Sequence, residues 1–107
     1  MDSILTSIKK LLGISSDYTH FDGDIILQIN SALSALTQLG VGPTEGFEIT
    51  DATSTWSEFF DDPRLNLAKT YVQIKVKLAF DPPTSSALIE SYNRQLDELA
   101  WRLTIAK

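Results

Sequence analysis

Residues 62–80, DPRLNLAKTYVQIKVKLAF, decide the fold of this chain. Asp62 is a preferred N-cap residue, and Pro63 follows at the first helical position, where its missing N–H is not needed. The helix predicted here reaches about Phe80. Its apolar residues cover more than half of its circumference and are Leu65, Leu67, Ala68, Tyr71, Val72, Ile74, Val76, Leu78 and Ala79. A helix with so wide an apolar surface needs contacts on two sides, so we place it at the centre of the molecule.

Two amphipathic segments precede this central helix. The first runs from about Ser3 to Leu12 and stops at Gly13. The second begins at Asp22, whose carboxylate is expected to cap the open amides of the helix, and it reaches Leu39. Gly40-Val41-Gly42-Pro43 ends it, because glycine accepts left-handed backbone and proline cannot continue a helix.

The segment between the second and the central helix is more polar. Phe47-Glu48-Ile49 alternates in polarity and indicates a short extended piece or edge strand. Thr55-Trp56-Ser57-Glu58 fits a capping box that begins one helical turn ending near Phe60. After the central helix, Asp81-Pro82-Pro83 breaks the chain.

The last predicted helix begins with Thr84 or Ser85 as its cap and runs to about Ala106. Its apolar stripe comprises Leu88, Ile89, Tyr92, Leu96, Leu99, Ala100 and Leu103. We expect this stripe to pack antiparallel to the central helix across the tight turn. The predicted fold is therefore all-α: residues 1–107 form one domain, a small bundle of about four helices with one short extended segment or hairpin between the second and the central helix.

Composition excludes several classes of protein. The chain has no cysteine, which removes disulfide frameworks, thiolate zinc sites and thiol nucleophiles. No apolar run approaches the roughly 20 residues that span a bilayer. Residues 1–13 lack the basic-then-apolar order of a secretory signal. We expect a soluble protein that makes no contact with membranes.

Charge is unevenly distributed along the chain, and its sum is −5. Nine acidic residues and no Lys or Arg lie between Gly13 and Pro63. Four basic residues then precede the next acid, and they are Arg64, Lys69, Lys75 and Lys77. Specific DNA binding is disfavoured, because proteins that bind phosphates carry basic surfaces. The segregated charges either attract opposite regions of identical neighbours or form two solvated faces.

No catalytic pattern is present in the sequence. His20, Asp22 and Asp24 are the only cluster of ligand-type residues, and the later acidic positions of a calcium loop are missing. Capping and the helix dipole explain the two aspartates better than a metal does. His20 has no second His or Cys with which to complete a zinc site or a nucleophilic pair. We expect no enzyme activity, no cofactor and no metal site.

Three aromatic residues, Trp56, Phe59 and Phe60, gather in a short polar stretch. They are either a satellite of the core or a contact between subunits. Lys75 projects into the apolar arc of the central helix, where it must extend its ammonium to water or meet a carboxylate of its own chain or of a neighbouring subunit.

Trp101 and Ile105 form a second apolar patch on the last helix. They lie four residues apart and roughly opposite the leucine stripe. Tryptophan is enriched among the residues that anchor protein interfaces, so the patch suits insertion into a partner. Packing against the first helix of the same chain explains the patch equally well.

Several segments in this order are typical of one family. They are Asp17-Tyr18-Thr19-His20-Phe21-Asp22, the Leu39–Pro43 stop, Trp56 with its aromatic turn, Lys75–Ser86, Asn93-Arg94-Gln95 and Trp101-Arg102. In these segments the chain resembles the head-tail connector (adaptor) proteins of long-tailed double-stranded DNA phages, especially members from phages and prophages of Gram-positive bacteria. The resemblance covers nearly the whole chain, and Lys75–Ser86 is its most specific part.

The resemblance implies a subunit that forms a ring below the portal protein and extends the DNA channel. The ring gives the stopper or tail-completion protein a docking surface, and DNA passes through without specific binding. The protein would be made in the bacterial host cytoplasm and reside in the virion at the head-tail junction. Candidate subunit contacts are Trp56, Phe59, Phe60 and Lys75, and candidate portal contacts are Trp101, Arg102 and Ile105.

Two rival functions are weighed against the connector. One is a small helical nucleic-acid-associated regulatory protein, which would need a basic recognition helix. The other is a small enzyme that uses His20, Asp22 and Asp24.

Overall fold

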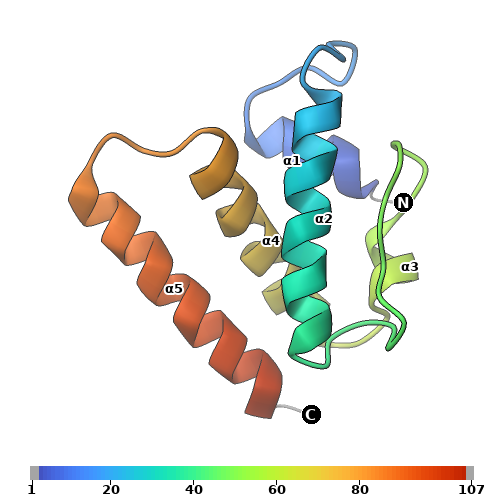
Figure 1. The fold of residues 1–107 in the computed structure, drawn as a ribbon, viewed down its shortest axis with the longest axis vertical. Helices are drawn as coiled ribbons and strands as arrows, with labels where there is room; N and C mark the ends of the chain where they lie inside the picture. Colours follow the sequence, from blue (N-terminus) through green and yellow to red (C-terminus); the bar gives the residue numbers. More distant parts are fainter. Residues whose placement is uncertain (1–2, 106–107) are drawn as a thin grey trace.

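The computed structural model describes residues 3–105, except for the side chain of Ile105. This part of the chain forms five helices and no strand (Figure 1). The helices are α1 (Ile4–Leu11), α2 (Asp22–Gln38), α3 (Trp56–Phe59), α4 (Leu65–Phe80) and α5 (Ser86–Ile105). The predicted all-α fold, a small bundle with four longer helices, is confirmed.

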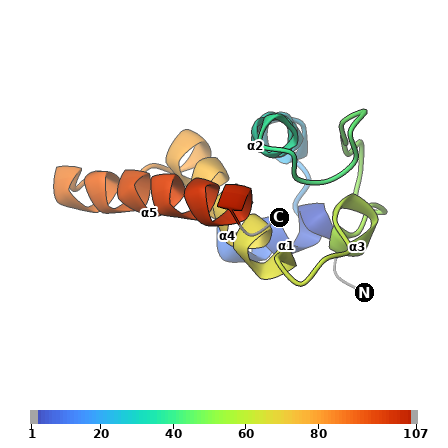
Figure 2. The ribbon, with the colours of Figure 1, turned by 90° about the horizontal axis from the view of Figure 1, so that it is seen from below.

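Helix α4 lies at the centre, as its wide apolar surface predicted. Helix α2 runs along one side of it and α5 along another, while α1 and α3 also contact it (Figures 1 and 2). The buried side chains of α4 are Ala68, Tyr71, Val72, Ile74 and Val76. Their directions spread widely around the helix axis, so no single neighbouring helix could cover them all.

The start of α4 differs from the prediction by two residues, since Leu65 and not Pro63 is the first helical residue. Pro63 and Arg64 form a turn, in which the backbone N–H of Leu65 donates to the carbonyl oxygen of Asp62 at 2.9 Å. The Asp62 carboxylate accepts the backbone N–H of Arg64, also at 2.9 Å. Asp62 therefore stabilises the turn before the helix and does not cap the helix itself.

The hydrophobic core joins α1, α2 and α4 to the short helix α3. Its largest fully buried side chains are Trp56, Phe59, Ile4, Ile8, Ile25, Ile29, Leu33, Leu36, Ile49 and Leu103. The capping box predicted for α3 is present, with the Thr55 backbone N–H donating to Glu58 at 2.7 Å. This local motif begins a helix of a single turn, which places two large aromatic side chains in the core.

The segment between α2 and α3 consists of turns, bends and irregular backbone, and the edge strand expected at Phe47-Glu48-Ile49 does not form. Asn30 of α2 takes the place of a strand partner: its Oδ1 accepts the Ile49 N–H at 2.7 Å, and its Nδ2 donates to the Ile49 carbonyl at 3.0 Å. Among the described residues, one isolated antiparallel bridge joins Ser3 to Thr55. A side chain therefore satisfies the backbone groups that an edge strand would otherwise leave open.

Helix α5 is covered on one side only. It packs mainly against α4, and Figure 2 shows it extending away from the other helices. Ser85 caps its start, accepting the Leu88 backbone N–H at 3.3 Å, as one of the two predicted caps. Of the predicted apolar stripe, Leu96, Leu99 and Leu103 are buried. The earlier part of the stripe is exposed or half-buried, so α5 leaves apolar surface open at its beginning.

Candidate assembly surfaces

Lys9 is the one charged residue that the subunit buries among the described residues, with 2% of the whole residue exposed. Its ammonium lies 2.7 Å from the Tyr18 carbonyl oxygen, 3.3 Å from the Ser16 carbonyl oxygen and 2.7 Å from Oδ1 of Asp22. The two carbonyl oxygens accept hydrogen bonds from the ammonium group, and the Asp22 carboxylate balances its charge. The buried charge is therefore paired and hydrogen-bonded, as burial of a charge requires.

The prediction that Asp22 caps α2 is wrong. The N-cap residue is Phe21, and Asp22 lies in the first turn of the helix, as Asp24 does. Oδ1 of Asp22 forms an ion pair with Lys9 and accepts no hydrogen bond from the described residues. Lys9 draws the carboxylate toward the core side of the helix, because a buried ammonium needs an anionic partner more than the helix amides need a cap.

The loop that Lys9 holds carries aromatic side chains on its outer side. Tyr18 and Phe21 have ring centroids 5.8 Å apart, and His20 lies 4.8 Å from Phe21. Phe21 also contacts Phe80 at the end of α4, with centroids 5.5 Å apart. Tyr18, His20 and Phe21 are exposed, so the subunit displays this cluster to its surroundings.

The side chain of Lys75 extends from the apolar arc of α4 to solvent. It is exposed, and its ammonium lies 5.9 Å from the ring centroid of Tyr71. No ion pair to it is found within residues 3–105. The carboxylate partner expected within the chain is therefore not among the described residues, and the ammonium extends to solvent along an aromatic face.

Trp56 and Phe59 belong to the core of their own subunit, which was one of the two predicted alternatives. Only 2% of Trp56 is exposed, and its Nε1 donates to Oγ of Ser7 at 2.9 Å. Phe60 is half-buried, and the Arg64 guanidinium lies 5.1 Å from its ring centroid. Of the three aromatics, Phe60 alone keeps surface for a second subunit.

Trp101 stands out from α5 with 63% of its surface exposed. This exposure argues against packing on α1, the second explanation considered for it. Arg102 is also exposed, and its contact with Glu98 is long at 3.7 Å. Ile105 ends α5, but its side chain lies outside the described part of the structure.

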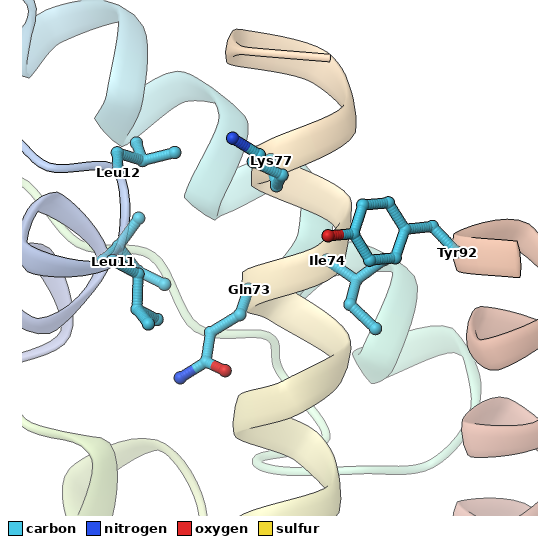
Figure 3. Close-up of a pocket in the computed structure, with 7 residues that line it drawn as sticks. Leu11, Leu12, Gln73, Ile74, Lys77 and Tyr92 are labelled. Carbon is cyan, nitrogen blue, oxygen red and sulfur yellow. The ribbon is translucent and has the colours of Figure 1, made fainter. Parts of the chain in front are cut away.

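An apolar groove opens between α1, α4 and α5, and sequence analysis did not identify it. Figure 3 shows Leu11 and Leu12 on one side, Tyr92 on the other, and Gln73, Ile74 and Lys77 of α4 between them. Its volume is about 200 Å³. Leu11 is 57% exposed, although it ends an otherwise well-buried helix. The groove forms because α5 covers α4 without reaching α1.

Arg64 forms an ion pair with Asp62 in the turn before α4 and a hydrogen bond to the end of α5. The Arg64 guanidinium donates to Asp62 at 2.9 Å through Nε, and to the Leu103 carbonyl oxygen at 3.0 Å through Nη1. The side-chain hydrogen bond from Arg64 lowers the pKa of Asp62, and the backbone N–H of Arg64 adds to this effect. The same pairing raises the pKa of Arg64. The arginine thus satisfies one of the open carbonyls at the end of α5.

The described residues show no arrangement typical of a hydrolytic or metal centre. Within residues 3–105, no three His, Cys, Asp or Glu side chains gather closely enough to hold a metal ion. His20 is exposed beside aromatic rings and faces no nucleophile that the structure describes. None of the described helices has the length and apolar character needed to cross a membrane.

The fold is that of a small helical subunit, and an apolar groove and exposed side chains such as Trp101 lie on its surface, features that can mark protein–protein contacts. Residues 4–107 match the family model described as phage connector protein. The chain belongs to this family, so its resemblance to phage connector proteins is confirmed and its role is that of a structural phage connector. Comparisons with curated proteins and with solved structures find no match. Membership implies assembly with other phage head or tail proteins and a place in the virion.

Proposed function

We propose that this protein forms a ring below the portal, extends the DNA channel, and links the filled head to the stopper or tail-completion protein. It works by binding, and we assign it no catalytic step. The observation that carries the proposal is the family match over residues 4–107. Exposed apolar side chains support it, because neighbouring subunits and a portal would cover such groups.

Fewer residues are proposed as subunit contacts than the sequence suggested. Trp56 and Phe59 are enclosed by their own subunit, so we no longer place them between subunits. Phe60 and Lys75 stay in the proposed interface, because both present surface to a neighbour. Lys75 is suited to meet a carboxylate of the adjacent copy, since the acidic stretch from Gly13 to Pro63 offers many.

The end of α5 is the proposed docking region for the portal. Arg102 is exposed and only loosely paired, so its guanidinium can bind a carboxylate of the portal in a bidentate manner. Ile105 stays in this proposal as an apolar contact of the same region. Trp101 is exposed on the same helix, one residue before Arg102.

The acidic surface suits a position at the DNA channel. Two carboxylates of the acidic stretch, those of Asp22 and Asp62, form ion pairs within the subunit. Its exposed acids are Asp17, Asp24, Glu45, Glu48, Asp51, Glu58 and Asp61. A negative channel wall repels phosphates, so DNA would slide past without specific binding.

Binding to isolated portal rings tests the proposed function. The purified protein is mixed with portal rings of the same phage, and the complexes are viewed by negative-stain electron microscopy. We expect an additional ring on one face of the portal. The proposal is wrong if portal rings stay bare at micromolar concentrations of the protein.

Filter binding with double-stranded DNA tests the rival function. The connector should show weak binding at low salt and none at physiological salt. Tight, salt-dependent binding would instead support a nucleic-acid-associated regulatory protein.

A further inference from the structure

Two features of α5 lie on opposite sides of the helix. Tyr92 forms one wall of the groove between α1, α4 and α5, and Trp101 projects into solvent. The two residues are nine positions apart, which at about 100° per residue places them half a turn from each other. The tryptophan of a subunit therefore cannot fill the groove of that same subunit. It can only fill the groove of another molecule.

The groove matches an indole side chain in size and chemistry. Its volume is about 200 Å³, and most of its lining is apolar, from Ile8, Leu11, Leu12, Ile74 and Tyr92. An engineered apolar cavity of about 150 Å³ is large enough to bind benzene. The groove thus has room for a bicyclic aromatic ring, and Gln73 at its edge offers a carbonyl oxygen to the indole N–H.

Charge around the two features is also complementary. Asp97 and Glu98 precede Trp101 by about one helical turn, and both are exposed. Lys77 lines the groove, and among the described residues its ammonium forms an ion pair with the exposed Asp81 alone, at 3.0 Å. An incoming α5 would therefore bring two carboxylates toward the cation at the groove, which favours correct docking.

We propose that Trp101 of one subunit inserts into the groove between α1, α4 and α5 of the next subunit. The inference rests on the proposed function, because it names the contact through which copies join. Such a contact uses two different surfaces of each subunit, so it does not close on itself as a two-fold dimer does. Repetition of this contact produces a ring, if the rotation closes, or an open filament.

The absence of cysteine from the chain allows a direct test. Two single-cysteine proteins are made, Thr104→Cys beside Trp101 and Lys10→Cys beside Leu11, both at exposed positions. The two variants are mixed, once without and once with portal rings, and each mixture is treated with a short thiol crosslinker. We expect crosslinked heterodimers of the two variants. As a control, Ser34→Cys on the exposed side of α2 replaces Lys10→Cys and should give several-fold less product.

Truncation of the tryptophan gives a second readout. Trp101→Ala should weaken self-association at least about tenfold, because buried tryptophans contribute much of the binding energy at interfaces. Sedimentation velocity measures this change, both for the protein alone and for the protein bound to portal rings. Leu27→Ala is the matched control, since Leu27 is 65% exposed and lies on α2 away from the groove. Circular dichroism should show the same helix content in both variants, because neither side chain supports the core.

Other outcomes separate this inference from the proposed function. If Trp101→Ala keeps its self-association but loses portal binding, Trp101 belongs to the portal contact and the inference is wrong, while the proposed function stands. Crosslinking of Thr104→Cys mainly to itself would indicate a two-fold dimer and would also overturn the inference. If the wild-type protein binds neither portal rings nor itself, both proposals fail.

Discussion

The ammonium nitrogen of Lys9 lies 2.7 Å from Oδ1 of Asp22, in an ion pair that joins α1 to the first turn of α2. The side chain of Lys9 is 3% exposed and that of Asp22 is 25% exposed. Two carbonyl oxygens of the connecting loop complete the surroundings of the ammonium. One buried cation thus connects α1 to the start of α2 and to the aromatic loop between them.

Replacement of this cation should destabilise the fold. Lys9→Met keeps the length of the side chain but leaves Asp22 and two carbonyl groups without their donor. We expect a loss of about 2–4 kcal/mol in the free energy of unfolding, because removing one partner strands the other. Urea denaturation measures the change.

The neighbouring lysine provides a matched control for that experiment. Lys10 is exposed on the same helix, so Lys10→Met should change stability by less than about 0.5 kcal/mol. Equal effects of the two substitutions would show that the charge of α1, and not the buried ion pair, matters for stability.

Asn30 should be essential for the segment that precedes α3. Its side chain makes two hydrogen bonds to the backbone of Ile49, which is 1% exposed. Asn30→Ala leaves a buried N–H and a buried carbonyl unpaired, so we expect a loss of about 2–3 kcal/mol. Hydrogen exchange of the Ile49 amide should become much faster, while Asn93→Ala, at an exposed position of α5, should alter neither quantity.

Gly42 is required for a conformational and a steric reason. Its φ is +85°, and a Cβ atom at this position would lie 2.6 Å from Cε1 of Phe59. Gly42→Ala should therefore cost about 2–4 kcal/mol, the sum of left-handed strain and displacement of a core ring. Gly46 has a φ of +93° and open space around it, so Gly46→Ala should cost about 1–2 kcal/mol. Thermal unfolding of both variants isolates the contribution of the steric clash.

Asp62 should contribute to stability in a pH-dependent way. The hydrogen bond from Arg64 lowers its pKa in the folded state. A depressed folded pKa gives stability that is present above the unfolded value, about 3.9, and lost as the pH falls through the folded value. The difference in stability between wild type and Asp62→Asn should thus be constant between pH 8 and pH 5 and shrink below pH 4. Denaturation curves at several pH values would contradict this if the difference grew in acid.

Much of the helical architecture was predictable, because its signals are local. The apolar period of α4, the capping box of Thr55 and Glu58, and the cap at Ser85 each depend on residues within a turn or two. Physical contacts along one short segment decide such features, so the sequence shows them directly. The failure at Asp22 shows the limit of this reasoning, since its partner Lys9 lies in another helix.

The candidate surfaces were only partly predictable. Trp101 was correctly placed opposite the buried stripe of α5, because helical period alone fixes which side a residue occupies. The sequence left open whether Trp56 and Lys75 are buried in their own subunit, since burial depends on which distant segments pack against them. A signal for Lys9 did exist: it follows Leu5 by four residues and so shares the apolar side of α1.

By itself, the sequence determined where the helices lie, which sides of them are apolar, and that the chain resembles phage connectors. Only the tertiary structure decided that Lys9 is the buried cation, that Asn30 substitutes for a strand, and that α1 and α5 leave a groove over α4. The physical reason is the distance along the chain over which the deciding interactions act. Helical period and caps act between near neighbours in the chain, whereas burial, ion pairing and grooves depend on how distant segments pack together.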